Sequence, residues 1–201
     1  METIFYADLL GTFAFSITGI ISSIRHQIDP VGAFFLALVT AMGGGIIRDM
    51  LLGVPSSTFN NPYYLTTVFI GFLFTYLFTN KIKEIYQIFL YLDAFGLAIF
   101  TLIGVEKSIS LNVHCFGCIL AGTLTAVGGG VIRDTLIGDF PFIFHKEIYA
   151  ASSLVGGTIF YCVYKLNFLP LTWNILLSAT LILGLRLWGH RKNIHLPRFH
   201  R

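Results

Sequence analysis

The chain has 201 residues, of which 55% are hydrophobic and 15% aromatic, while only 11% are charged. Soluble domains carry about 25% charged residues, so 13 basic and 10 acidic side chains would leave a water-soluble domain of this length without a polar shell. The mean hydropathy of +0.78 agrees. The composition argues strongly against a soluble enzyme and predicts an integral membrane protein.

Seven stretches approach the length of about 20 apolar residues that a membrane-spanning helix needs. They cover residues 6–24, 31–53, 63–79, 86–105, 113–138, 147–164 and 171–188. Short polar connections, marked by Pro30, Pro62 and Pro170, leave no room for a soluble domain between them. We therefore predict one all-α membrane domain over residues 1–188, followed by a basic tail over residues 189–201.

The basic residues predict the orientation of these spans, because loops rich in Lys and Arg stay in the cytoplasm. One side holds Arg25, Lys81, Lys83, Lys146, Arg186, Arg191, Lys192, Arg198 and Arg201, and the other side holds Lys107 and Lys165. We expect a multi-pass protein of the inner (plasma) membrane, with its N-terminus outside and its C-terminus in the cytoplasm. The basic tail is expected to contact anionic lipids and not nucleic acid.

The start of the chain carries the acids Glu2 and Asp8 where a cleavable signal peptide would have basic residues. We therefore expect the first span to be kept in the mature protein.

The chain contains an internal duplication. Residues 6–53 align with residues 91–138 at a constant shift of 85 positions, with 18 identities in 48. The most similar segment is GGGIIRDMLLG, ending at Gly53, against GGGVIRDTLIG, ending at Gly138. The same shift relates Tyr64 to Tyr149.

The duplication predicts the arrangement of the spans. Each repeat, over residues 6–79 and 86–164, holds three spans, and an odd number makes the second copy enter the membrane from the opposite face. The prediction is an inverted 3+3 repeat with a pathway at the repeat interface, as in many transporters and some channels. The seventh helix, 171–188, lies outside the duplication and is expected to be peripheral or interfacial.

Each repeat carries three successive glycines inside an apolar span, and each glycine disfavours helix by about 1 kcal/mol relative to Ala. The triplets are Gly43, Gly44 and Gly45, and Gly128, Gly129 and Gly130. Close packing of helices is one interpretation, since small residues let backbones approach. Because both triplets precede an Arg-Asp pair, we favour a kinked or unwound helix that lines a pathway.

The Arg-Asp pairs, Arg48-Asp49 and Arg133-Asp134, lie before the ends of their spans. An unpaired charge there costs about 3 kcal/mol, so each pair needs partners or water. Shared depth predicts Asp8 as the partner of Arg48, and Asp93 as the partner of Arg133. The result is one charged cluster per membrane face, which either lines a pathway or holds the repeats in register.

Hydroxyl side chains recur at equivalent depths, in the pairs Ser16/Thr101 and Thr40/Thr125. Hydroxyls can replace part of the hydration shell of a cation. They can also bond to their own helix carbonyls, which is the favoured interpretation for each one taken singly. The remaining charged pairs, Glu106-Lys107 and Lys146-Glu147, are taken as interfacial.

The cysteines do not indicate a metal or redox site. Cys115 and Cys118 are spaced as a CxxC, but no histidine or second cysteine pair lies at ligand spacing, so we interpret them, with Cys162, as packing residues. The spans also hold no HExxH and no obvious Ser-His pair. We expect no enzyme activity, no catalytic or metal-binding residues and no cofactor.

The duplicated GGGxxRDxLxG motif on seven spans resembles the bacterial and archaeal trimeric intracellular cation (TRIC) channels, a family that also carries an older label as glycine transporters. The resemblance implies a homotrimer with one potassium-permeable pore per subunit, lined by the first, second, fourth and fifth spans. It implies bends at both glycine triplets, and polar pore residues at Arg48, Asp49, Arg133 and Asp134. Animal members carry a Lys-Glu-Val run associated with lipid binding at the trimer centre, and this chain lacks that run.

The predicted function is a homotrimeric channel for monovalent cations, chiefly potassium. Four acids, Asp8, Asp49, Asp93 and Asp134, against two arginines make the predicted pathway net negative, which favours cations. A secondary transporter of glycine or another small zwitterion is the alternative, because paired Arg and Asp side chains suit a zwitterion and no TVGYG-like filter is present. A non-conducting scaffold would not need duplicated intramembrane charges.

Overall fold

The structure, a computed structural model, describes residues 2–78, 85–145 and 148–192, and all regular secondary structure within these ranges is helical. The seven long helices are α1 (Glu2–Arg25), α2 (Pro30–Leu51), α4 (Pro62–Phe78), α5 (Ile85–Ser110), α6 (Cys115–Leu136), α8 (Tyr149–Lys165) and α9 (Leu171–Lys192). They match the seven predicted spans to within a few residues. Two short helices, α3 (Ser57–Asn60) and α7 (Phe142–His145), lie at equivalent places in the repeats and were not predicted.

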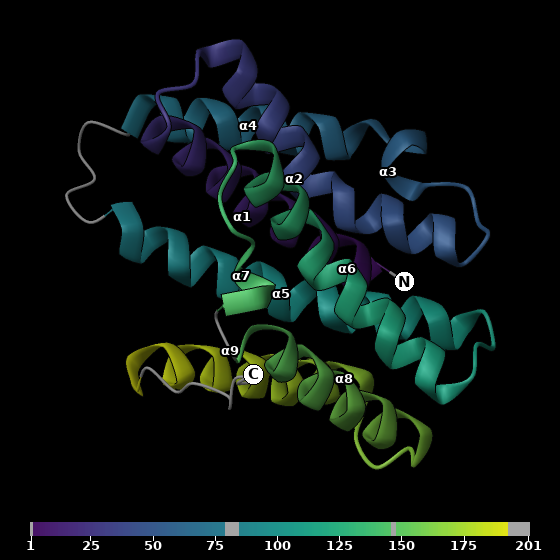
Figure 1. Cartoon of the computed structure of the whole chain (residues 1–201). Coiled ribbons are helices and arrows are strands. Elements are labelled where there is room, and N and C mark those ends of the chain that lie inside the picture. The colour runs from purple at the N-terminus through teal and green to yellow at the C-terminus, as the bar shows by residue number, and fades with distance from the viewer. Residues whose placement is uncertain (1, 79–84, 146–147, 193–201) are drawn as a thin grey trace, which may run out of the picture.

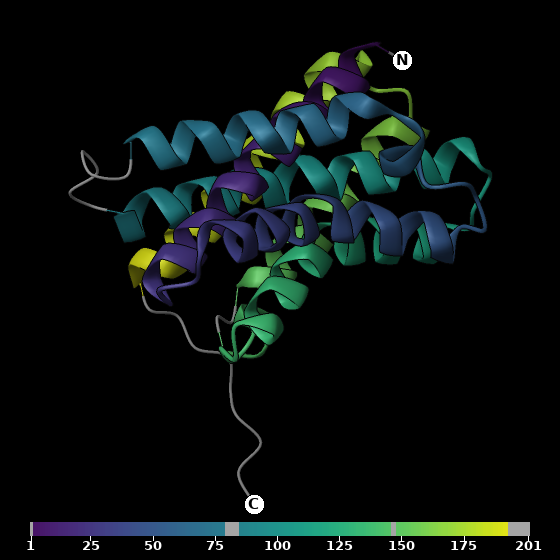
Figure 2. The ribbon, with the colours of Figure 1, turned by 90° about the horizontal axis from the view of Figure 1, so that it is seen from above.

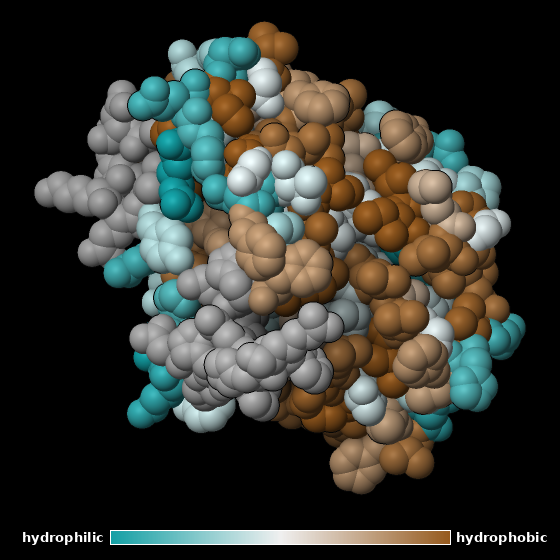
Figure 3. Space-filling view, viewed as in Figure 1, coloured by the Kyte–Doolittle hydropathy of each residue, from teal (hydrophilic) through white to brown (hydrophobic). Residues whose placement is uncertain are grey.

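The long helices suit a membrane. By length and composition, α1, α2, α5, α6 and α9 can each cross one, and α4 is a shorter apolar helix. Their ends gather at two ends of the molecule, with α3 at one end and the last turn of α9 at the other (Figures 1 and 2). In the same view, hydrophobic side chains cover the broad middle and hydrophilic ones lie toward the two sides (Figure 3).

Four helices form the centre of the fold. Helix α1 packs against α2, α2 against α6, α6 against α5, and α5 against α1, which closes a ring. Helix α4 covers α1 and α2, while α8 covers α5 and α6. Phe15 of α1 and Phe100 of α5 are equivalent residues of the two repeats, and their rings meet edge to face at 5.0 Å. This contact joins equivalent positions of the two repeats in the centre of the fold.

The last glycine of the repeated motif ends its helix. Gly53 and Gly138 adopt positive φ values of 65° and 77°. After α2, the Gly53 amide donates to the Met50 carbonyl oxygen, and the Val54 amide to the Asp49 carbonyl oxygen. The same pair of bonds recurs after α6. These paired bonds form the glycine-ended helix stop known as the Schellman motif, which requires a left-handed residue.

The middle glycines of the triplets allow α2 and α6 to touch. An ideal β-carbon on Gly44 would lie 2.0 Å from the carbonyl oxygen of Thr125, and one on Gly129 would lie 2.1 Å from that of Thr40. The two contacts are reciprocal, since each glycine meets the threonine of the other repeat. They also show that α2 and α6 cross in opposite directions.

The middle glycines of the triplets are therefore packing positions, which is the interpretation that the sequence did not favour. Helix α2 is continuous through residues 43–45 and α6 through residues 128–130, so the expected unwound form is wrong for this structure. The hydrogens of Gly44 and Gly129 face a neighbouring backbone, where a side chain would clash, whereas a β-carbon on Gly45 would make only ordinary contacts. A bend within the continuous helices stays a prediction.

Helix α9, which the sequence predicts to be peripheral or interfacial, also contributes side chains to the protein interior. It packs against α8 and α5, and its Asn174 side-chain amide donates to the Phe160 carbonyl oxygen at 3.0 Å. Its Ile182 fills the space beside Gly156 of α8. One face of α9 is buried, while Trp173 and Trp188 are exposed. The buried face carries Arg186 into the protein interior.

Candidate functional site

The repeated motif builds two buried polar clusters. The first cluster comprises Asp8, Arg48, Asp49, Ser57, Tyr64 and Lys107, and the second comprises Thr18, Asp93, Arg133, Asp134, Tyr149 and Arg186. Because α2 and α6 cross in opposite directions at their glycines, and each Arg-Asp pair follows its own glycines, the clusters lie on opposite sides of the crossing.

In the first cluster, Asp49 is the centre of the hydrogen bonds. Its Oδ1 accepts from Arg48 Nε at 2.7 Å and from Lys107 Nζ at 2.7 Å. Its Oδ2 accepts from the backbone amide of Ser57 at 2.9 Å and from the Ser57 hydroxyl at 3.0 Å. Asp49 thus ties α2 to the first residue of α3 and to α5.

Asp8 and Arg48, which we predict to lie within direct or water-bridged reach, share no direct bond among the described contacts. Asp8 Oδ2 accepts a hydrogen bond from the Tyr64 hydroxyl at 2.6 Å. Arg48 donates from its Nε to Asp49 Oδ1 and from its Nη2 to Ser57 Oγ at 3.3 Å. Asp8 remains within electrostatic reach of Arg48, Lys107 and Asp49.

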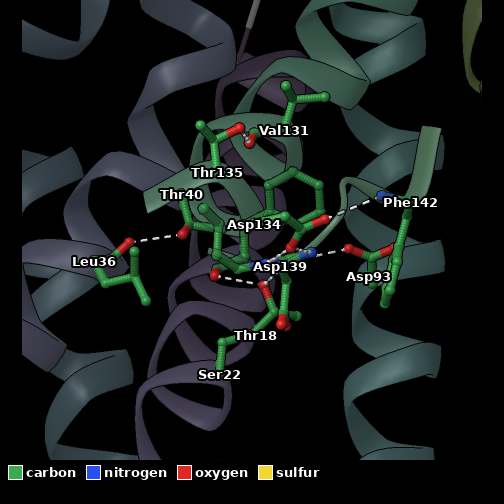
Figure 4. A network of polar contacts seen from close by, with 12 residues as sticks. Thr18, Ser22, Leu36, Thr40, Asp93, Val131, Asp134, Thr135, Asp139 and Phe142 are labelled. Atoms are coloured by element: carbon green, nitrogen blue, oxygen red, sulfur yellow. Dashed lines mark hydrogen bonds and ion pairs between the residues drawn. The ribbon is translucent and has the colours of Figure 1, made fainter. Parts of the chain in front are cut away.

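In the second cluster, Arg133 is the centre. Its Nε donates to Asp134 Oδ1 at 2.9 Å, and its Nη1 donates to Asp93 Oδ1 and to Thr18 Oγ1, each at 3.2 Å. Asp134 Oδ2 accepts from the Phe142 amide at 3.2 Å, which ties α6 to α7. The side chains of Thr18, Asp93 and Asp134 converge from three helices (Figure 4). The predicted proximity of Asp93 and Arg133 is confirmed.

Aromatic rings complete the second cluster. The Arg133 guanidinium lies over the Phe89 ring, 4.7 Å from its centroid. Arg186 lies over the Tyr149 ring, also at 4.7 Å, and its Nη2 is 4.0 Å from Asp93 Oδ2. The Tyr149 hydroxyl faces Asp93 Oδ1 at 3.5 Å. Such cation–ring contacts stabilise a charge held away from water.

Near the second cluster, His26 in the loop between α1 and α2 contacts Asp139 in the segment after α6. The ring nitrogens of His26 lie 2.9 Å from the Ser22 carbonyl oxygen and 3.2 Å from Asp139 Oδ1. Ser22 and Asp139 appear beside Thr18 and Asp134 in Figure 4. This contact links the α1–α2 connection to the segment that follows α6.

The polar side chains join helices that face each other across the central ring. Lys107 of α5 reaches Asp49 of α2, and Arg133 of α6 reaches Thr18 of α1. Neither pair of helices is adjacent in the ring order, so each contact crosses its interior. The interior between α1, α2, α5 and α6 is therefore lined by charge at both ends.

The candidate hydroxyls donate to their own helices. Ser16 Oγ donates to the Phe13 carbonyl oxygen, and the three threonine hydroxyls donate to the carbonyl oxygen four residues before each. Thr101 Oγ1 also contacts Ser153 Oγ at 2.6 Å. This is the interpretation favoured for each hydroxyl taken singly, and their oxygens keep lone pairs that can still accept.

Two cations change the predicted charge balance. Lys107 adds a positive charge to the first cluster and Arg186 adds one to the second. Each cluster then holds two carboxylates and two cations, so the net negative pathway inferred from four acids and two arginines is wrong. Glu106 is a further acid within electrostatic reach of Arg48 and Lys107.

All ten candidate pathway residues are buried, with at most 8% of any of them exposed, at Asp8. Within the described residues, no group of three or more His, Cys, Asp or Glu side chains is placed to hold a metal ion. Cys118 is fully buried, and its thiol donates to the Val113 carbonyl oxygen at 3.1 Å. The charged and hydrogen-bonding side chains of the clusters can attract ions or bind polar groups.

Three features of the site were missed from the sequence. The sequence predicts an interfacial Lys107, counts Arg186 only among the basic residues of the cytoplasmic side, and gives Tyr64 and Tyr149 no role. The tyrosines were detectable, since they keep the repeat shift that relates Asp8 to Asp93. Lys107 and Arg186 have no charged equivalent in the other repeat, so the duplication could not reveal them.

Some sequence predictions fall on other parts of the chain. They concern Lys81, Lys83, Lys146, Glu147, Arg198 and Arg201, which lie outside the described residues.

Comparisons with known proteins cover nearly the whole chain. A family model described as "Glycine transporter" matches residues 5–80 and again residues 90–165. The UPF0126 inner membrane protein YadS of Escherichia coli is 33% identical over 198 residues, which cover 98% of this chain and 96% of that protein.

The fold is also similar to solved structures. The trimeric intracellular cation channel orthologue from Rhodobacter sphaeroides superposes with a TM-score of 0.91 at 29% identity, covering 96% of this chain and 100% of the other. A second TRIC cation channel superposes with a TM-score of 0.85 at 32% identity, covering 98% and 97%. The duplicated family match mirrors the repeats seen in the contacts.

Proposed function

We propose a function from one premise, which is that the chain belongs to the protein family described as "Glycine transporter", to which the UPF0126 membrane proteins and the prokaryotic TRIC channels also belong. The proposed function is a channel that conducts monovalent cations, chiefly potassium, passively through each subunit. The similar solved structures are described as cation channels, and this description is the main support for a channel function.

One observation supports the proposed pathway. Polar side chains bridge the interior of the α1–α2–α6–α5 ring at both of its ends, through Asp49 and Lys107 in one cluster and Arg133 and Thr18 in the other. Ionisable groups inside a membrane domain mark ion or substrate pathways by default. We propose that a cation passes between these clusters, and that the contacts described here belong to a closed conformation.

The glycine crossing lies between the two clusters. Gly44 and Gly129 bring the carbonyl oxygens of Thr125 and Thr40 to the contact of α2 with α6. Carbonyl oxygens are the ligands that potassium prefers in channels. A modest bend or separation of α2 and α6 at these glycines would turn the carbonyl oxygens toward the ring interior, which is how we propose the pathway opens.

The cation preference no longer rests on an excess of acids in both clusters. The Asp8 carboxylate at the first end accepts a hydrogen bond only from Tyr64 within the described contacts, and Glu106 is a further acid near this cluster. A carboxylate without a cation bonded to it attracts cations. We propose that this end attracts cations and that the neutral second cluster sets the rate at which they pass.

We propose a membrane topology of seven spans with an inverted repeat, an external N-terminus and a cytoplasmic C-terminus. The reciprocal contacts of α2 and α6 support a two-fold relation between the repeats. The described basic residues at the α9 end include Arg25, Arg191 and Lys192, all exposed, and this supports a cytoplasmic face there.

The subunit is proposed to assemble as a homotrimer, since the similar channel from Rhodobacter sphaeroides is described as trimeric. The outer helices present large apolar side chains such as Phe69 and Leu73 of α4, which suit contact with lipid or with another subunit. Native mass spectrometry of the purified protein in detergent should give three times the mass of one chain. A purely monomeric spectrum would contradict the trimer.

A carrier for glycine or another small zwitterion is the second candidate. It is favoured by the family description and by clusters that each pair carboxylates with cations. Liposomes containing the purified protein separate the two functions. Passive, non-saturating potassium flux without glycine uptake is the result expected here, and saturable uptake of labelled glycine without potassium flux would favour the carrier.

A further inference from the structure

Arg186 comes from a helix that lies outside the duplication, yet it enters the second cluster. Only 3% of the residue is exposed, and its guanidinium stacks on the Tyr149 ring at 4.7 Å. Its Nη2 lies 4.0 Å from Asp93 Oδ2. Helix α9 packs against α5, which carries Asp93, so the two charges are held by directly contacting helices.

The atoms between these two residues are incompletely satisfied. Within the described part of the chain, Asp93 Oδ2 and the Nε and Nη2 atoms of Arg186 are buried without a hydrogen-bond partner. Asp93 Oδ1, in contrast, already accepts from Arg133 at 3.2 Å. Buried charges persist only when they are paired and hydrogen-bonded. The free carboxylate oxygen and the facing guanidinium edge are therefore complementary halves of an ion pair.

The two-fold relation between the repeats explains why α9 is needed. In the first cluster, Lys107 of α5 neutralises Asp49. The equivalent of Lys107 in the first repeat is Ser22, which carries no charge, so α1 has no cation at this position to pair with the second cluster. Without Arg186, the second cluster would hold Asp93 and Asp134 against Arg133 alone.

We propose that Arg186 is the resident countercharge of Asp93, and that it keeps the Asp93 carboxylate paired when Arg133 moves away from Asp93 during conduction. Arg186 is then a positioning residue, which acts on permeant ions through Asp93. A guanidinium can hold a carboxylate by two parallel hydrogen bonds, and a shift of about 1 Å would bring Nη2 within hydrogen-bonding range of Oδ2. This inference rests on the proposed function for its role in conduction, whereas the pairing itself does not.

The first test is a double-mutant cycle of thermal unfolding in detergent, using Arg186→Gln, Asp93→Asn and the double variant. Arg186→Gln should lower Tm by about 6 °C, because it strips a buried carboxylate of one partner. The double variant should lose clearly less than the sum of the two single losses. Arg191→Gln is the matched control, since it removes a charge from the exposed side of the same helix. Losses that add strictly would overturn the pairing.

The second test measures ion selectivity, which a merely structural role would not change. Arg186→Gln leaves the second cluster with one net negative charge, so the ratio of potassium to chloride permeability should rise by about tenfold. Arg186→Lys keeps the positive charge and should show much less of this rise, while the exposed Arg191→Gln control should keep the wild-type ratio. An unchanged ratio in Arg186→Gln overturns the role in conduction. If the wild type itself passes no potassium, the proposed channel function fails, and the unfolding cycle alone still decides the pairing.

Discussion

Gly44 of α2 faces the carbonyl oxygen of Thr125 in α6 so closely that a β-carbon on Gly44 would lie 2.0 Å from it. The obstacle is helix backbone, which cannot rotate away as a side chain can. The repeat-related contact of Gly129 with Thr40 doubles this constraint. The close crossing of α2 and α6 therefore requires glycine at both positions, because neither has room for a β-carbon.

Replacing either glycine should destabilise the fold. Gly44→Ala and Gly129→Ala should each lower the free energy of unfolding by about 2 kcal/mol or more, since overpacking against backbone forces the helices apart. Thermal unfolding of the purified protein in detergent measures the effect. Gly45→Ala is the matched control, because its β-carbon would meet only Thr58 Cγ2 at an ordinary 3.5 Å. Equal stability of Gly44→Ala and Gly45→Ala would contradict the packing role.

The pair formed by Asp93 and Arg133 predicts strong coupling. Both side chains are fully buried, and removing one partner from such a pair costs about 3–5 kcal/mol. Asp93→Asn and Arg133→Gln should each be markedly less stable than the wild type, and the double variant should lose less than the sum. A cycle of four unfolding curves, with the wild type, both single variants and the double variant, tests this prediction. Additive losses would show that the two charges are stabilised independently.

The glycines that end α2 and α6 should tolerate no other residue well. Gly53→Ala and Gly138→Ala force a β-carbon into the left-handed conformation, which costs about 1 kcal/mol. Nothing lies within 4 Å of either position, so steric contact plays no part. Gly184→Ala is the control, since that position is also open but lies in helical α9. It should be neutral or stabilising, and a loss there equal to that at Gly53 would reject the conformational explanation.

The proposed topology predicts which loops are accessible from each side. Single cysteines at Asn112 and Lys192, two exposed positions, should label from opposite faces of the membrane in a background without Cys115, Cys118 and Cys162. An impermeant thiol reagent applied to intact cells should reach position 112 only. Labelling of both positions from outside would contradict the proposed topology of α6, α8 and α9.

The sequence could predict the helices and much of the site because both follow from simple rules. Apolar length located seven helices, and the constant shift of 85 residues paired Asp8 with Asp93 and Arg48 with Arg133. Burial cost then correctly brought Arg133 to Asp93. Apolar length and internal repetition can both be read from a single sequence, so these predictions needed no structure.

The missed features depend on three-dimensional contacts that break the repeat. Lys107 lies in the last turn of α5, where an interfacial position is ordinary, and only the approach of α2 gives it Asp49 as a partner. Arg186 required the packing of α9 against α5. The role of the glycines was misjudged because propensity describes an isolated helix, whereas the reciprocal crossing stabilises α2 and α6 as continuous helices.

Single-channel recording of the purified protein in planar bilayers under a potassium chloride gradient tests the proposed cation channel most directly. We expect discrete unitary currents whose reversal potential lies toward the potassium equilibrium potential. In Asp93→Asn, the unitary conductance should change while the protein stays assembled, because Asp93 lies in the second cluster beside Arg133 and Arg186. Currents that reverse toward the chloride potential, or membranes that carry saturable glycine uptake and no unitary current, would contradict the channel.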